Sequence, residues 1–393
     1  MSTRTRRLLG ALVLGSALTT AVVTPPPAGA YPDAPTRVAI DGTCEGELHR
    51  LHDEARAQAG RPALREDPAF DQVARAWAFR QARAGTMAHN PDYVRQISAK
   101  VPDWRRITEN VGYAPTPVRL HNAYMNSSGH RANILDSGVQ RIGVGCVRDA
   151  NGRLWSTVNF VGAGSSIPDR RPTPFRSAGD ASSRLRWWLL AAGPSEAQVE
   201  ADATNLLRSW SAADLAVYLA DSSTHAGLVP GAVRLYGAAF DRNPDASGLN
   251  FWIRERQRGV SLTRMATILA ASAEFTTLYG DLGNRAFVEQ VYRNVLNREP
   301  DAGGVAFWVS ELNRGVTRGK VLVGFSESAE NKRATAADVV VSWAYAQLLG
   351  RVATSLERLQ WTTLLTAGTP PATLVRTLVA TPDFNRRVAT GGF

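Results

Sequence analysis

Hydrophobic positions between residues 44 and 85 recur with the spacing of two amphipathic helices. In the first, one helical face carries three apolar residues and a histidine at i, i+3, i+4 and i+7: Leu48, Leu51, His52 and Ala55. The segment Gly60-Arg61-Pro62 is expected to end this helix. Asp67 is expected to cap the second helix, with Pro68 at its first position and Gly85 at its end.

Further along, the pattern changes to short helical and extended segments. Residues 117–125 predict a third, short helix, and residues 142–147 alternate between apolar residues and glycine or valine. Residues 155–161 are also extended in character. Between these two extended runs, Asn151 and Gly152 form the dipeptide that favours a tight hairpin turn. This half of the chain is therefore predicted to mix helices with a small antiparallel sheet.

The second half of the chain repeats itself. Tyr236, Arg242, Trp252 and Glu274 recur without a gap 56 residues later. Their counterparts in the second copy are Tyr292, Arg298, Trp308 and Glu330. A weaker third copy follows 53 residues on, and a degenerate partial copy is expected earlier, around Trp187, Trp188 and Gly193. The period predicts an all-α array of packed units at about 229–283, 285–337 and 338–390.

Local signals inside the second copy predict three of its helices. The first is expected over residues 285–296. Asp301 is expected to cap the second helix, which ends at Gly315, and Thr317 to cap the third. The recurring Tyr and Trp residues are interpreted as core, with a carbohydrate-stacking surface as the alternative.

The N-terminal segment has the features of an export signal. Arg4, Arg6 and Arg7 precede a mostly apolar stretch, and Ala28-Gly29-Ala30 offers a cleavage site of small residues. We therefore expect a signal peptide over 1–30 and a secreted or envelope-associated product with no stable membrane span after cleavage. An uncleaved anchor is the alternative. Residues 31–43 are expected to be an irregular lead-in, and the Pro-, Ser- and Arg-rich residues 164–183 a linker.

Composition and charge narrow the range of partners. The 393 residues are 44% hydrophobic and 20% charged, which is typical of globular domains. The net charge is +10, but the arginines are scattered and form no dense basic run. Nucleic-acid binding is therefore not expected. The two cysteines, Cys44 and Cys146, are expected to pair in an exported protein.

Several motifs between residues 44 and 163 resemble the CAP family, which comprises cysteine-rich secretory proteins, antigen 5 and pathogenesis-related proteins. The matching segments are Ala88-His89-Asn90, Glu109-Asn110-Val111, Ile142-Gly143-Val144-Gly145 and the long run from Tyr124 to Leu135. Tyr124 stands where the bacterial branch usually has Trp. The resemblance implies an α–β–α sandwich, giving an α+β chain with the helical repeats behind it.

The resemblance also implies a cleft with ligand-type side chains. By motif, His89, Glu109 and His130 correspond to three members of the family's two-His, two-Glu set, and the second Glu has no counterpart here. Two imidazoles and a carboxylate suit Zn²⁺ or another divalent cation. A structural hydrogen-bond cluster is the alternative interpretation. His121 is expected to face solvent, and neither His49 nor His52 resembles a ligand.

Three functions stay open at this point. The first is an extracellular binding protein whose cleft holds a small lipid or anionic ligand, with repeats that contact a cell-envelope polymer or another protein. The second is a metal-assisted hydrolase of peptide or cell-wall material with Glu109 as general base. The third is an adhesion protein with a vestigial cleft. Ser127 and Ser128 form no convincing nucleophile constellation.

The repeats resemble a second family. The pattern Tyr…Arg-x-Pro-Asp…Gly…Trp…Gly…Ser-x-Glu-Phe over roughly 229–387 is similar to the bacterial domain of unknown function numbered 4214. The third copy has Ala353-Thr354 in place of the Pro-Asp pair. This resemblance implies architecture and no chemistry.

Overall fold

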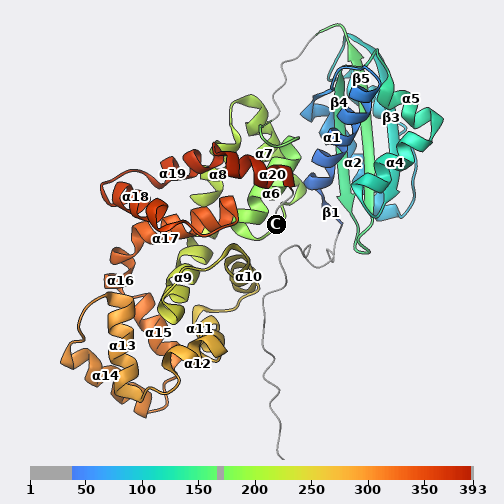
Figure 1. Cartoon of the computed structure of the whole chain (residues 1–393). Helices are drawn as coiled ribbons and strands as arrows, with labels where there is room; N and C mark the ends of the chain where they lie inside the picture. The colour runs from blue at the N-terminus through green and yellow to red at the C-terminus, as the bar shows by residue number, and fades with distance from the viewer. Residues whose placement is uncertain (1–37, 166–171, 391–393) are drawn as a thin grey trace, which may run out of the picture.

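A computed structural model describes residues 38–165 and 172–390. The expected signal peptide and the centre of the expected linker lie outside the described residues. Residues 38–165 form a mixed α/β unit, and residues 172–390 form a helical region beside it (Figure 1). The predicted fold class, an α–β–α domain followed by helices, is confirmed.

The mixed unit is built on one sheet of five strands. The strands are β1 (Ala39–Ile40), β2 (Arg65–Glu66), β3 (Trp104–Ala114), β4 (Arg141–Arg148) and β5 (Leu154–Ala163). The order is β1-β4-β5-β3, and β2 also pairs with β4. β4 runs antiparallel to β5 along its whole length, so β1 and β2 share its other edge. The two short strands pair with opposite ends of β4 and leave its middle without a strand partner on that side.

Helices cover both faces of the sheet. They are α1 (Gly42–Gln58), α2 (Pro68–Ala84), α3 (Tyr93–Ser98), α4 (Pro117–Asn126) and α5 (Ser128–Leu135). Ile142 and Val144 of β4 pack with α1, α4 and α5, whereas Gly143 and Gly145 face α2. A Cβ at Gly143 would lie 2.3 Å from a backbone atom of Phe70. The alternation of apolar residue and glycine therefore lets α2 lie directly on the strand.

Local sequence signals set the ends of α2 as predicted. The side chain of Asp67 accepts the amide of Ala69, Pro68 is the first helical residue, and Gly85 ends the helix with a φ of 65°. The lead-in differs from its prediction, because residues 39–40 form β1 and α1 begins at Gly42. The expected disulfide joins Cys44 of α1 to Cys146 of β4, with 5.9 Å between the Cα atoms.

The helical region consists of α6 to α20. Their bounds are α6 (Ala178–Leu190), α7 (Glu196–Arg208), α8 (Ala212–Ala220), α9 (Ser223–Phe240), α10 (Ala246–Gln257), α11 (Leu262–Ala270), α12 (Ala273–Tyr279), α13 (Asn284–Leu296), α14 (Ala302–Asn313), α15 (Arg318–Ser326), α16 (Ala329–Ala334), α17 (Ala336–Ala344), the π-helix η1 (Tyr345–Leu349), α18 (Ser355–Thr366), α19 (Pro371–Val379) and α20 (Pro382–Thr390). The predicted caps Asp301 and Thr317 begin α14 and α15.

The turn geometry of the helical copies recurs before residue 229. The first long helix of each copy ends at a residue in the left-handed conformation: Ala191, Asp241, Asn297 and Gly350. The next helix is then capped by a short polar side chain: Ser195, Asp245, Asp301 and Thr354. The segment from α6 onward, which includes Trp187 and Trp188, therefore repeats the turn and capping geometry of the later copies. The shared turn and caps support the degenerate early copy, which stays a prediction.

The two regions pack together through α1 and α6. A Cβ at Gly42 would lie 2.0 Å from the carbonyl oxygen of Gly179, and one at Gly46 would lie 2.8 Å from the Asp180 side chain. Residues 178–183, expected to belong to the linker, are instead the first turns of α6. The chain's last helix returns to this place, since Phe384 of α20 packs edge-on against Trp188. In the described part of the chain, no helix has the length and apolar character needed to cross a membrane.

Candidate functional site

Glu109 lies in the middle of β3 and His89 lies in the segment that follows α2. The ring Nδ1 of His89 is 2.8 Å from Glu109 Oε1, which also accepts the backbone N–H of Asn90 at 2.9 Å. Trp77 of α2 holds this segment, because its indole N–H donates to the carbonyl of Ala88 at 2.7 Å. Strand and loop therefore bring together two residues that stand twenty positions apart.

The two side chains differ sharply in exposure. Glu109 is 4% exposed, whereas 59% of the His89 side chain is accessible. Burial raises the pKa of Glu109, and the hydrogen bonds from Asn90 and His89 oppose that rise. Within the described residues, Glu109 Oε2 is buried and has no hydrogen-bond partner. A buried acceptor without a donor is costly, so this oxygen is suited to a donor or cation supplied by a ligand.

His130, the third residue of the proposed site, lies on α5. It lies in the first turn of α5 rather than in an isolated turn, and its backbone carbonyl accepts the Asn110 side chain at 3.1 Å. Its half-buried ring packs edge-on against Tyr124, with 5.2 Å between the centroids. Burial, and secondarily the charge of nearby His89, lower the pKa of His130. At neutral pH its imidazole is therefore neutral and has a lone pair available.

His89, Glu109 and His130 lie near one another, but their ligand atoms are not arranged closely enough to surround a metal ion. Among the described residues, the group of His, Cys, Asp and Glu side chains with all ligand atoms within 4.8 Å of one another is His49, Glu66 and Asp71. The ligand atoms of His89, Glu109 and His130 do not all lie within 4.8 Å of one another. The unpartnered Glu109 oxygen fits a cation, but the imidazoles would have to rotate toward it. The metal prediction therefore stays a prediction.

The prediction for His121 was wrong. His121 is 7% exposed and its Nδ1 lies 3.3 Å from Nδ1 of His52, which is fully buried. Burial lowers the pKa of both rings. The cause is the packing of α4 on α1, which turns the polar side of a short helix inward.

Sequence reasoning missed a second group of titratable side chains. Glu45, Glu66 and Asp71 are buried where α1, β2 and α2 meet, and His49 lies beside Glu66 and Asp71. Burial raises the pKa of Glu45 and of Glu66 to about 7 and raises that of Asp71 well above its usual range. In sequence, Asp71 was an ordinary acidic residue in the first turn of a helix. No local signal showed that the helical region would cover it.

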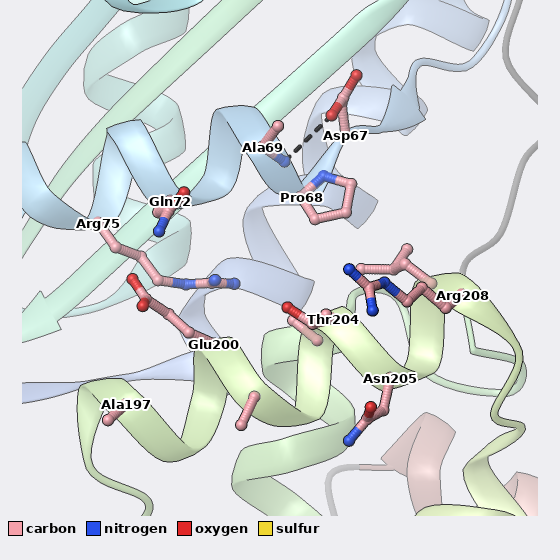
Figure 2. Close-up of a pocket in the computed structure, with 13 residues that line it drawn as sticks. Asp67, Pro68, Ala69, Gln72, Arg75, Ala197, Glu200, Thr204, Asn205 and Arg208 are labelled. Atoms are coloured by element: carbon pink, nitrogen blue, oxygen red, sulfur yellow. Dashed lines mark hydrogen bonds between the residues drawn. The ribbon is translucent and has the colours of Figure 1, made fainter. Parts of the chain in front are cut away.

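A pocket of about 730 Å³ opens between α2 and α7. Gln72 and Arg75 of α2 line one side, and Glu200, Thr204 and Arg208 of α7 line the other. Figure 2 shows Arg75 reaching into the space between the two helices. The pocket therefore lies at the junction of the two regions and not beside His89, Glu109 and His130.

Comparison with protein families gives a match in each region. Residues 49–161 match the cysteine-rich secretory protein family, CAP. This chain contains a CAP domain. The match includes His89, Glu109, His130 and the sheet that holds them, so the resemblance seen in the motifs is confirmed. Residues 265–335 match the domain of unknown function 4214, which spans the second helical copy and part of the first. A search of curated proteins found no match.

Similar solved structures include three bacterial proteins. An outer surface protein of Borrelia burgdorferi is 18% identical, with a TM-score of 0.29, over 31% of this chain and 93% of that one. An extracellular SCP-domain protein of Bacillus anthracis is 22% identical, with a TM-score of 0.27, over 30% and 41%. A cysteine-rich secretory protein of Staphylococcus aureus is 22% identical, with a TM-score of 0.24, over 30% and 38%.

Proposed function

We propose that the chain is an exported, extracellular binding protein. Its CAP domain would bind a small lipid or anionic ligand beside His89, Glu109 and His130, with a divalent cation such as Zn²⁺ at the same place. Its helical region would contact a cell-envelope polymer or another protein. The observation that carries this proposal is the buried Glu109 oxygen that has no partner within the described residues.

The chemistry of the site argues for a cation when the ligand is an anion. The Glu109 carboxylate alone would repel an anionic group. A divalent cation beside this carboxylate and the two imidazoles would reverse the local charge and leave a coordination position open. The His89–Glu109 hydrogen bond supports this arrangement. Because a carboxylate oxygen accepts, Nδ1 of His89 donates to Glu109, and Nε2 is the ring nitrogen left for a cation.

Calorimetry tests the binding part of the proposal. Zn²⁺ would be titrated into the mature chain, and octanoate would then be titrated as an anionic lipid probe with and without Zn²⁺. We expect Glu109→Gln to remove the octanoate heat and to lower the number of bound Zn²⁺ by about one, because the amide keeps an acceptor for Asn90 but loses the charge. Asn122→Ala, an exposed neighbour on α4, is the matched control. Equal octanoate heats for the wild type and Glu109→Gln would exclude this site.

Export rests on the N-terminal signal pattern and on the disulfide. Cys44 and Cys146 pair in the CAP domain, and such bonds persist mainly in oxidising compartments. N-terminal sequencing of the protein from culture medium tests this directly. We expect a mature chain that begins at Tyr31. An intact N-terminus on cell-retained protein would contradict the proposal.

Exposed apolar side chains support the contact role of the helical region. Phe307 on α14 is 57% exposed, and Leu356 and Leu359 on α18 are 63% and 65% exposed. Co-sedimentation of the full chain with envelope fractions would compare the wild type with Phe307→Ser and Leu359→Ser. We expect both variants to bind less. Unchanged sedimentation would remove these helices from the contact surface.

A further inference from the structure

Three acidic side chains and one arginine are buried together at the junction of the two regions. Glu45 and Asp71 are 0% exposed, Glu66 is 3% exposed and Arg75 is 1% exposed. They come from α1, α2 and β2, and the first turn of α6 covers them. Side chains of this charge are almost never fully buried without partners.

Each carboxylate is held at one oxygen by a backbone amide. Asp71 Oδ1 accepts the N–H of Val144 at 2.7 Å, and Glu45 Oε1 accepts that of Cys146 at 3.3 Å. These two amides belong to the part of β4 that neither β1 nor β2 reaches. Glu66 Oε1 accepts the N–H of Ala178 in α6 at 3.0 Å. The carboxylates thus complete the edge of the sheet, and their positions are fixed by the fold.

The charges in this cluster do not balance. Arg75 forms two hydrogen bonds of 2.7 Å with Glu45, so that pair is neutral. Glu66 and Asp71 remain, and Arg75 lies only at 3.6 Å from Asp71. Glu66 Oε2 and Asp71 Oδ2 are buried and face each other, and in the described part of the chain no donor outside this carboxyl pair reaches them. Two carboxylates with two unused oxygens are the charge complement of one dication.

We propose that His49, Glu66 and Asp71 bind one buried divalent cation at this junction. One ligand atom from each residue lies within 4.8 Å of the other two. Ligand atoms around a tetrahedral Zn²⁺ at bond lengths of about 2.1 Å are about 3.4 Å apart, so small side-chain rotations would close the site. This inference stands apart from the site proposed at His89, Glu109 and His130.

The ligand set favours Zn²⁺ over Ca²⁺ or Mg²⁺. One imidazole and two carboxylates are typical zinc donors, whereas the larger coordination shells of Ca²⁺ and Mg²⁺ need six or more oxygens, often from water. A junction buried to this extent has little room for such a shell. Arg75 lines the pocket between α2 and α7 and also contacts Asp71. Arg75 therefore lies between the pocket and Asp71, one of the proposed ligands.

Such a cation would join the two regions mechanically. His49, Glu66 and Asp71 tie α1, β2 and α2 to one point, and Glu66 also holds the N-terminus of α6. The competing explanation is a proton shared between Glu66 and Asp71, which would satisfy the same two oxygens. Only the first explanation predicts a bound metal ion. The two also differ in the change in stability that they predict when either carboxylate is replaced by a neutral amide.

Metal content and thermal stability of the full chain decide between them. The wild type, Glu66→Gln and Asp71→Asn would be exposed to Zn²⁺, dialysed and analysed by plasma mass spectrometry. The Gln side chain keeps an oxygen that can accept the N–H of Ala178, and the Asn side chain keeps one that can accept the N–H of Val144. We expect the wild type to hold about one Zn²⁺ more than either variant, because both variants keep the separate site at Glu109. We also expect a Tm that falls with chelator and recovers with Zn²⁺ only in the wild type.

A control separates this site from the CAP site. His130→Ala should retain the tightly held Zn²⁺, whereas its loss there would assign the metal to the CAP site and overturn the proposal. A wild type that holds no Zn²⁺ and whose Tm ignores both Zn²⁺ and chelator would also overturn it. In that case Glu66→Gln and Asp71→Asn should match or exceed the wild-type Tm, as a shared proton requires.

Discussion

Glu66 in the CAP domain accepts the backbone N–H of Ala178, the first residue of α6, at 3.0 Å across 112 positions of sequence. This bond lies beside the close contact of α1 with α6, where Gly42 faces the carbonyl of Gly179. The helical region is therefore packed directly on the CAP domain. The residues just before α6 do not separate two independent domains.

Gly42→Ala should loosen this junction. The new methyl group would lie 2.0 Å from the Gly179 oxygen, a backbone atom that cannot rotate away. We expect a loss of about 2 kcal/mol in the free energy of unfolding, the usual cost of overpacking a tight contact. Limited proteolysis should also cut the chain faster between residues 164 and 177.

Gly129→Ala is the matched control for that substitution. Gly129 lies in α5 of the same domain, and a Cβ there would meet nothing within 4 Å. Alanine is a better helix former, so stability should stay the same or rise by about 1 kcal/mol. Equal losses for Gly42→Ala and Gly129→Ala would mean that the α1–α6 contact is not the cause.

An arginine bridge recurs in the helical copies at one spacing. Arg242 binds Glu274, Arg298 binds Glu330 and Arg351 binds Asp383, each 32 positions apart. Each guanidinium also lies over a tyrosine ring of its own copy. The bridge therefore fixes the fourth helix of a copy against its first. This explains why Tyr, Arg and the acidic residue repeat together in the sequence.

The Arg242–Glu274 pair should show a small favourable coupling. Both side chains are more than two-fifths exposed, so solvent screens their charges. A double-mutant cycle of Arg242→Ala and Glu274→Ala, measured by urea unfolding, should give about 0.5 kcal/mol. Purely additive losses would show that the stacking on Tyr236, and not the ion pair, stabilises the copy.

Buried His225 should make the helical region sensitive to acid. Burial lowers its pKa to about 4, against 6.5 for the free side chain, although Nε2 lies 3.1 Å from Gln347 Oε1. Because the unfolded chain takes up the proton first, stability is complete above pH 6.5. It is lost as the pH falls toward 4, by about 2–3 kcal/mol in all.

His225→Gln removes that titration and keeps a donor for Gln347. The Tm difference between the variant and the wild type, recorded from pH 7 to pH 4, should shift in favour of the variant as the pH falls. A difference that stays constant over this range would contradict the burial argument. A Tm difference that comes to favour the wild type at low pH would show that the pKa of His225 is raised in the folded chain, the opposite of what burial predicts.

Features fixed by neighbouring residues were predictable, and those fixed by distant contacts were not. Asp67, Pro68 and Gly85 act on their own helix, and the period of 56 residues shows the repeated unit directly. The start of α6 within the expected linker combines a local cap that the sequence analysis did not use, Ser177 on the amide of Asp180, with the distant acceptor Glu66. His121 was misplaced for the same reason, since its burial depends on His52 in another helix.

The candidate site was predicted in part. The motifs identified His89 and Glu109, whose side chains form a hydrogen bond, and His130, whose pKa responds to His89. They did not show that Glu109 keeps one unpartnered oxygen, because that depends on burial beneath the loop at Asn90. Nor did they indicate Glu66 and Asp71, whose burial depends on distant contacts with α6 and β4 respectively.

Anomalous diffraction at the zinc absorption edge, from crystals of the mature chain soaked in Zn²⁺, tests the proposed CAP site most directly. We expect a peak against the Glu109 carboxylate and the rings of His89 and His130. A fully soaked crystal without density there would contradict it. A peak among His49, Glu66 and Asp71 would be read separately, as the test of the buried cation.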